Sequence, residues 1–318
     1  MKEEAPIELR AWRQFLAVAE ELHFGRAAQR LHMTQPPVTQ AIAQLERTLG
    51  VQLFDRTRRR VALTAAGEAL VPEVRALLAQ ARSLPARARA ADSGEAGRVR
   101  LAFVSTIGFD RLPGWVRDFR EHSPQVALEL VEATGDVQLE SLARGDIDAG
   151  LLLHPPGAAP AGLARLAVAQ EPLVLALPAA HALAQQLRPA LAEVMDEPLV
   201  LYPRRILPGV HDAVMQLYAA HGRRPRVAQE AIQMQTIVNL VSGGLGVAWV
   251  PASVTAFSRA GVVYRRAEEL KERGGKKVTL PSCETSLVWL AERQPPALAR
   301  FVRFLRTRAE AGEAGEAG

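Results

Sequence analysis

Residues 24–46 read FGRAAQRLHMTQPPVTQAIAQLE, and this stretch decides the fold of the N-terminal part of the chain. Apolar residues in its first half have the i, i+3, i+4, i+7 spacing of a short helix, and they are Phe24, Ala27, Ala28 and Leu31. Thr34 is a good N-cap for a second helix, because a hydroxyl can accept a hydrogen bond from a free backbone N–H. Pro36 and Pro37 fit the first turn, where a missing N–H costs nothing.

The second helix has its own apolar stripe, at Val38, Ile42, Leu45 and Leu49, and Gly50 is suited to end it. Two short helices joined by a tight turn, with small residues where they cross, are typical of a helix-turn-helix. The polar face of the second helix carries amides, hydroxyls and a guanidinium, which suit base edges and phosphates in the major groove. An ordinary helical pair with a solvated polar face is the alternative. The candidate DNA-binding residues here are Thr34, Gln35, Pro36, Pro37, Thr39, Gln40 and Gln44.

A basic loop flanked by two short strands follows the helix pair. Val51 and Leu53 alternate as one strand, residues 55–60 form a basic turn, and Val61 and Leu63 return as a second strand. This predicts a winged helix-turn-helix. Arg58 and Arg59 in the turn are candidates for contacts with phosphates or with a narrow minor groove. A solvated loop is the alternative.

These motifs together resemble the N-terminal pattern of LysR-type transcriptional regulators, in an aromatic-catabolism-like branch. The matching segments are Phe15-Leu16-Ala17-Val18-Ala19-Glu20, Thr34-Gln35-Pro36-Pro37-Val38, Leu49-Gly50-Val51-Gln52-Leu53-Phe54-Asp55-Arg56 and Leu63-Thr64-Ala65-Ala66-Gly67. Thr39 and Gln40 stand where the family often has Ser and Arg, so the resemblance does not say which bases they read. It implies a winged helix-turn-helix, a long linker helix and a two-lobed, periplasmic-binding-protein-like effector domain.

The composition fits this division. The chain has 318 residues, 48% of them hydrophobic and 23% charged, which is enough for two or three globular domains. The net charge is +5. Residues 1–65 hold ten Lys and Arg against seven Asp and Glu, whereas the remaining residues hold 29 against 27. Most of the positive surplus therefore lies with the candidate DNA-binding residues.

Several classes of site are disfavoured by the sequence. Cys283 is the single cysteine, which excludes an internal disulfide and a cysteine-based zinc site, and we expect no cofactor and no bound metal. The charged start, Met1-Lys2-Glu3-Glu4, has no apolar signal segment. No apolar run approaches membrane-spanning length, so we expect a cytoplasmic protein without a membrane partner.

Residues 65–92 are predicted to form a linker and dimerisation helix. Along it the apolar residues step by four, three, four and three, as in a coiled-coil seam, at Leu70, Val74, Leu77, Ala81 and Leu84. Packing on its own domain is the alternative. We prefer a dimer, because DNA-reading heads usually act in pairs. The resemblance implies a two-fold dimer of these helices and a homotetramer overall.

After residue 97 strands alternate with helices, which predicts an α/β domain with a parallel sheet and helices on both faces. We expect a DNA-binding domain at 1–64, the linker at 65–92, a hinge at 93–97 and the effector domain at 98–308. Lobe I is expected at about 98–170 and 276–308, lobe II at about 171–275, and a disordered tail at 309–318.

Ligands of open α/β sheets bind beyond the carboxyl ends of the strands. The polar residues expected at those ends are the candidate effector contacts, and they are Ser105, Thr106, Thr134, His154, Tyr202 and Arg204. Helices that start there offer N–H groups and positive dipole ends, which favour a carboxylate. Each candidate has a structural alternative: the hydroxyls can be helix caps, the imidazole a structural group and the guanidinium a surface charge.

Two classes of function are the main hypotheses, and a third is weaker. The first is a regulator whose effector, expected to be a small organic anion such as an aromatic acid, changes how paired heads sit on an interrupted inverted repeat of double-stranded DNA at a promoter. RNA polymerase is a further candidate partner. The second is an enzyme with a DNA-anchoring head, but no nucleophile elbow, metal-spaced His cluster or dinucleotide fingerprint supports it. A solute-binding protein is a third, opposed by the missing signal segment. We therefore predict a regulator and not an enzyme.

Overall fold

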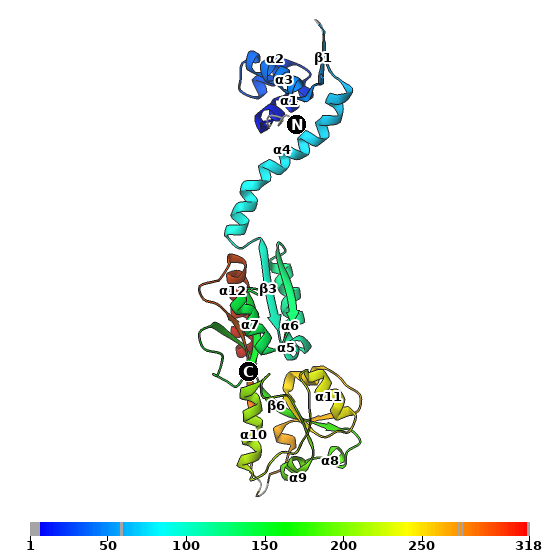
Figure 1. Ribbon diagram of the computed structural model, residues 1–318, viewed down its shortest axis with the longest axis vertical. Coiled ribbons are helices and arrows are strands. Elements are labelled where there is room, and N and C mark those ends of the chain that lie inside the picture. The colour runs from blue at the N-terminus through cyan, green and yellow to red at the C-terminus, as the bar shows by residue number, and fades with distance from the viewer. Residues whose placement is uncertain (1–6, 58–59, 273, 275, 317–318) are drawn as a thin grey trace. The chain divides into compact units, whose positions relative to one another are not determined.

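The computed structural model describes residues 7–57, 60–272, 274 and 276–316. The chain forms two compact units that meet in sequence between Arg89 and Ala90, and each is described here by itself (Figure 1). In the described part of the chain, no helix combines the length and the apolar composition that crossing a membrane requires.

The first unit contains the predicted helix-turn-helix. Its three helices are α1 (Leu9–Glu21), α2 (Phe24–Arg30) and α3 (Gln35–Leu49). The apolar stripes of α2 and α3 both face one core, in which Ala27, Val38 and Ile42 are completely or almost completely buried. Gly50 ends α3 in the left-handed region, at a φ of 70°, which favours glycine.

The wing differs from its predicted bounds. Strands β1 (Phe54–Thr57) and β2 (Arg60–Leu63) pair antiparallel, so most of the stretch expected to be a turn is strand. The first strand begins at Phe54 and not at Val51, because the neighbouring residues Leu53 and Phe54 are both buried, which a strand's alternation does not allow. Arg58 and Arg59 lie outside the described residues.

Helix α4 (Ala65–Asp92) uses two faces, which corrects the single predicted seam. Val74 and Leu78 are buried in the core of the first unit, which we call the head, with Leu70 packed against them. Leu77 and Leu84 are 41% and 54% exposed. The first half of the predicted seam therefore packs partly on its own domain, and an apolar stripe is left exposed along the second half.

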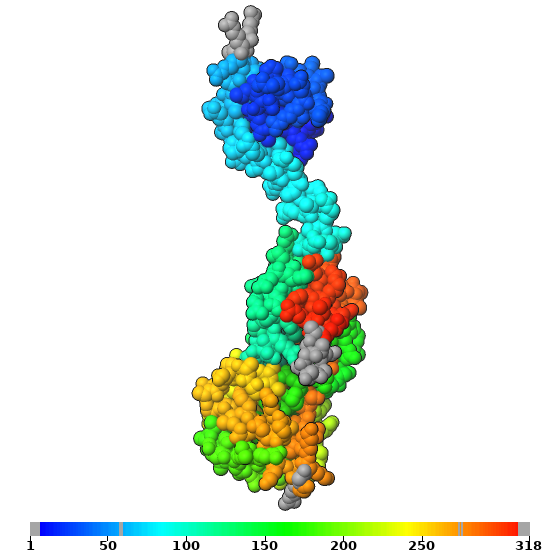
Figure 2. Space-filling model, turned by 180° about the vertical axis from the view of Figure 1, so that it is seen from behind, coloured from blue at the N-terminus to red at the C-terminus, as the bar shows by residue number. Residues whose placement is uncertain are grey.

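In the second unit, lobe I is built on the parallel strands β3 (Gly97–Phe103), β4 (Val126–Glu132) and β5 (Ala149–His154). Apolar clusters cover both faces of this sheet. Figure 2 shows the C-terminal helix, in red, beside the segment that contains β3 and β4. The helices of lobe I are α5 (Ser105–Phe109), α6 (Arg111–His122), α7 (Gly135–Arg144) and α12 (Pro296–Glu316).

Lobe II has a core of its own around Trp249 and Tyr218. Its strands are β7 (Leu199–Leu201), β8 (Val227–Glu230), β9 (Ala248–Pro251) and β10 (Val262–Arg265). Its helices are α8 (Ala182–Gln185), α9 (Leu191–Asp196), α10 (Pro208–Ala220), α11 (Met234–Ser242), η1 (Ala252–Ala256) and η2 (Ala267–Glu269).

Two long antiparallel strands, β6 (Ala164–Pro178) and β11 (Ser282–Trp289), join the lobes. The strand order is β10-β6-β11-β5-β3-β4, with β9 also paired to β6, so the sheet is mixed and not parallel as predicted. The reason is the path of the chain: it leaves lobe I along β6 and returns along β11, which must run the opposite way. β6 also passes without a break through residue 170, where the predicted lobe boundary lies.

Helix α12 continues to Glu316, into residues 309–318, for which a disordered tail was predicted.

Candidate functional site

The candidate DNA-binding residues lie on and just before α3. Thr34 is the N-cap residue of this helix, but its hydroxyl makes no capping hydrogen bond. The side chains at the start of the helix and along one flank are exposed, opposite the buried Val38, Ile42 and Leu45; they are Gln35, Pro36, Pro37, Gln40 and Gln44. The arrangement presents a polar helical face to solvent.

The polar groups on this face are not equally free. Thr39 Oγ1 donates a hydrogen bond to the carbonyl of Gln35 at 3.2 Å. Gln40 has no hydrogen-bond partner among the described residues, so its amide can pair with a base edge. The amide of Gln44 is already engaged, because it accepts from Arg47 at 2.6 Å and donates to Thr48 at 3.4 Å.

Glu46 fixes the wing to α3, and sequence reasoning missed it. Its carboxylate accepts the backbone N–H groups of Leu53 and Phe54 at 2.9 and 3.2 Å. It also pairs with Arg56 at 2.6 Å, and that guanidinium lies 5.0 Å from the centre of the Phe24 ring. The signal available in the sequence was an acidic residue, Glu46, on the second predicted helix, followed by the basic residues of 55–60.

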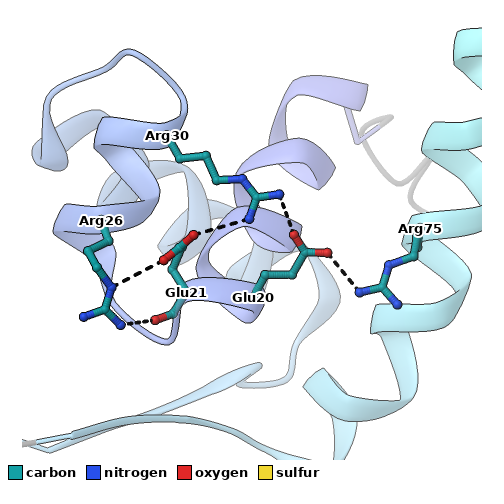
Figure 3. A network of polar contacts seen from close by, with 5 residues as sticks. All are labelled: Glu20, Glu21, Arg26, Arg30 and Arg75. Atoms are coloured by element: carbon teal, nitrogen blue, oxygen red, sulfur yellow. Dashed lines mark hydrogen bonds and ion pairs between the residues drawn. The ribbon is translucent and has the colours of Figure 1, made fainter.

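An ion-pair network ties α1 to α2 and α4 (Figure 3). Glu20 pairs with Arg75 at 2.9 Å and with Arg30 at 2.7 Å, and Glu21 pairs with Arg26 at 3.3 Å. The hydrogen bond from Arg75 is the main cause that lowers the pKa of Glu20; burial opposes it, and the hydrogen bond from Arg30 adds to the lowering. The network therefore holds the start of α4 against the helix-turn-helix.

A cavity of about 50 Å³ lies between the two lobes. Four helices begin at its wall: α5, α7, α10 and α11. Helix starts present free N–H groups and positive dipole ends. No Lys, Arg, Asp or Glu among the described residues lines the cavity, so these dipoles and neutral side chains set its electrostatics.

Two hydroxyls in the cavity wall have no partner. Thr106 of lobe I is 2% exposed and Tyr202 of lobe II is 1% exposed, and neither hydroxyl forms a hydrogen bond with any described residue. Burial raises the pKa of Tyr202 far above its usual value, so its hydroxyl keeps its proton and can donate it. These two buried, unpartnered hydroxyls belong to residues that line one cavity from opposite lobes.

Two of the other candidate residues also line the cavity, half-buried: Ser105 and Thr134. Sequence reasoning missed Gln233, which immediately precedes α11, because glutamine is not a preferred N-cap residue. It also missed the apolar part of the wall, whose positions depend on how the two lobes face each other; these residues include Ile206, Leu207, Ile232 and Met234.

Two candidate effector residues, His154 and Arg204, do not line the cavity. The His154 ring is buried, with Nδ1 2.7 Å from the Pro155 carbonyl oxygen and Nε2 3.8 Å from Glu284 of β11. Arg204 is an exposed surface residue that makes two 2.8 Å hydrogen bonds to Asp212. That pairing lowers the pKa of Asp212 to about 2. Among the described residues, no cluster of His, Cys, Asp and Glu is arranged to hold a metal ion.

Comparisons with known proteins agree with this division of the chain. Residues 9–68 match the family described as "Bacterial regulatory helix-turn-helix protein, lysR family", and residues 92–310 match the "LysR substrate binding domain". The chain is 44% identical over 298 residues to the HTH-type transcriptional regulator IlvR of Caulobacter vibrioides, covering 93% of this chain and 97% of that protein. It is 39% identical over 266 residues to AlsR of Bacillus subtilis, covering 83% of this chain and 87% of that protein.

A crystal structure of full-length CbnR with its target DNA resembles the chain, with a TM-score of 0.75 and 32% identity over 95% of this chain and 99% of that one. The predicted helix-turn-helix and two-lobed domain are thus confirmed at the level of family and fold. The chain belongs to the LysR family of DNA-binding transcriptional regulators, and it combines their helix-turn-helix head with their effector-binding domain.

Proposed function

We propose that a small organic anion held between the lobes controls how the head binds promoter DNA. The observation that carries this proposal is the pair of buried, unpartnered hydroxyls on Thr106 and Tyr202. A buried hydroxyl without a hydrogen bond costs roughly 1–3 kcal/mol. A carboxylate between them would accept both hydrogen bonds, so ligand binding would recover this cost and draw the two lobes together.

The size and polarity of the cavity define the ligand class. A volume of about 50 Å³ holds roughly four water-sized groups, which corresponds to a short carboxylic acid. An aromatic acid would fit only if the lobes moved apart. The four helix starts favour negative charge, and the apolar side chains from lobe II suit a short hydrocarbon part.

The exposed stripe of α4 supports a homodimer. It contains Leu77, Ala81, Leu84 and Ala88, which follow the i, i+4, i+7, i+11 spacing of a helix-packing face. Two of the three acids of this helix, Glu68 and Glu73, come before its four basic residues, which are Arg75, Arg82, Arg87 and Arg89, and the third, Asp92, follows them. An antiparallel pair would therefore place Glu68 and Glu73 of one helix near the arginine-rich second half of the other. A tetramer of two such dimers on an interrupted inverted repeat, and contact with RNA polymerase, stay predictions from the family resemblance.

The test is a thermal-shift screen of the full chain against short aliphatic acids, aromatic acids and uncharged amides of the same size. We expect an acid to raise the Tm of the effector domain, by an amount that corresponds to about 2.7 kcal/mol at a hundredfold excess over its Kd. Thr106→Val and Tyr202→Phe should each reduce that shift strongly.

The same substitutions make a second prediction without any ligand. Removing a hydroxyl that has no partner should leave the free energy of unfolding unchanged or raise it by up to about 1 kcal/mol. If no acid of either kind shifts the Tm, or if the shift survives both substitutions, the anionic effector site is not in this cavity.

A further inference from the structure

A groove of about 760 Å³ runs along the head between the first turn of α1 and one flank of α3. Its polar lining includes Glu8, the residue before α1, Arg10 of α1, and Gln40, Gln44 and Arg47 of α3. Both arginine side chains are exposed, and neither forms an ion pair with a described residue. The groove therefore has a positively charged residue on each wall.

The position of the groove relative to α3 suggests what occupies it. An α-helix with its side chains is about 10–12 Å across, and the major groove of DNA is about 12 Å wide. A helix inserted there brings its two flanks close to the phosphates of the two strands. One flank of α3 carries the wing, held through Glu46 and Arg56. The opposite flank carries this groove.

Gln44 holds Arg47 in place on that flank. The Arg47 guanidinium donates to Gln44 Oε1 at 2.6 Å, and the amide nitrogen of Gln44 donates to Thr48 Oγ1 at 3.4 Å. Thr48 Oγ1 in turn donates to the Gln44 carbonyl at 3.0 Å. Both ends of the Gln44 amide are thus engaged within α3. Arg47 is exposed and uses one of its five N–H donors in this contact, which leaves four for a ligand.

We infer that Arg10 and Arg47 bind phosphates of one DNA strand from the two walls of this groove, and that Gln44 is the positioning residue for Arg47 and not a reader of bases. Glu8, on the wall with Arg10, opposes this contact by its charge. The inference rests on the proposed DNA binding and adds a second backbone contact, on the flank of α3 away from the wing.

The first experiment titrates a random-sequence duplex with the full chain by fluorescence anisotropy at a series of salt concentrations. Each phosphate contact contributes about 0.9 to the salt slope, which is about eightfold in affinity at 0.1 M salt relative to 1 M. Arg10→Ala and Arg47→Ala should each flatten the slope by about 0.9 and weaken binding at 0.1 M salt by about eightfold. Glu8→Gln should strengthen binding.

The matched control is Arg13→Ala. Arg13 is exposed on the same helix, one turn after Arg10, but it lines a different cavity, with Arg30 and Arg82. We expect it to leave the slope within about 0.2 of the wild-type value. An unchanged Tm of the head in each variant shows that the fold is intact.

The second experiment separates positioning from base reading at Gln44, by selecting from a random duplex library with each variant. Gln44→Ala should weaken binding to all sequences by the same factor and leave the selected sequences unchanged. In the Arg47→Ala background it should have no further effect, because the residue it positions is absent.

Wild-type slopes in Arg10→Ala and Arg47→Ala would overturn the phosphate contacts, and a changed set of selected sequences in Gln44→Ala would overturn its positioning role. A wild-type chain that binds no duplex would instead refute the proposed function, and this inference with it.

Discussion

The head and the effector domain differ in whether their buried polar side chains all have hydrogen-bond partners. Six buried side-chain polar atoms have no hydrogen-bond partner among the described residues, and all six belong to residues between Thr106 and Arg265. In the described part of the head no such atom occurs, and the polar side chains of α3 lie on its surface. The described part of the head therefore has no buried polar group left unpaired, whereas two of the six in the effector domain, the hydroxyls of Thr106 and Tyr202, belong to residues that line the cavity between the lobes.

The largest expected effect tests whether the two regions are energetically separate. Phe15 of the head and Phe301 of lobe I are both fully buried, against Phe54 and Phe119 respectively. Phe15→Ala and Phe301→Ala should each lower the free energy of unfolding of their own unit by about 3–5 kcal/mol. Calorimetry should show one of two transitions moving in each variant. A single transition that moves in both would contradict the separation.

A second substitution would create in the head the kind of defect that the effector domain already contains. Glu46→Ala leaves the N–H groups of Leu53 and Phe54 without their acceptor. We expect the free energy of unfolding of the head to fall by about 2–3 kcal/mol, and duplex binding to weaken because the wing loses its support. Glu46→Gln keeps one acceptor oxygen and is the milder control. Equal stability of the alanine variant and the wild type would show that water replaces the carboxylate without cost.

The smallest effect concerns pH, which should act in opposite directions in the two regions. Hydrogen bonds from Arg75 and Arg30 lower the pKa of Glu20 below its usual 4.5, so its contribution to the stability of the head is present above 4.5 and is lost as the pH falls through the lowered value. Burial raises the pKa of Glu171, despite hydrogen bonds from Ser253, so its contribution is complete below 4.5 and is lost as the pH rises through the raised value.

The measurement is the Tm of each unit between about pH 3 and 7, in wild type and in Glu20→Gln and Glu171→Gln. Because the arginine partners of Glu20 are exposed, we expect differences of only about 1–2 °C. If the difference in Tm between wild type and variant changes with pH in the same direction in both units, these two carboxylates do not cause an opposite pH dependence.

The sequence predicted most accurately what depends on local periodicity. The bounds of α2 and α3 and the glycine that ends α3 follow from apolar spacing and capping rules, and the structure has them there. The first strand of the wing was predicted to begin at Val51, three residues too early. Leu53 and Phe54 are both buried and their N–H groups are bound by Glu46, a tertiary contact that no alternating pattern indicates.

The cavity between the lobes shows more clearly what could not be predicted from the sequence. That Thr106 and Tyr202 lie near strand ends was predictable, but the direction of each side chain depends on how the lobes pack. His154 also ends a strand, yet its ring faces Glu284 on β11, because β11 pairs with β5 and occupies that side. Arg204 lies only two residues after Tyr202, but its side chain hydrogen-bonds to Asp212, eight residues later on α10.

The most direct test of control by a ligand between the lobes is to measure duplex binding with and without an acid that raises the Tm of the effector domain, in wild type and in Thr106→Val. We predict that the acid changes the affinity or the selected sequences of the wild type, and that Thr106→Val binds the duplex normally but no longer responds. A response of the same size in Thr106→Val would contradict the claim that a ligand between the lobes controls the head.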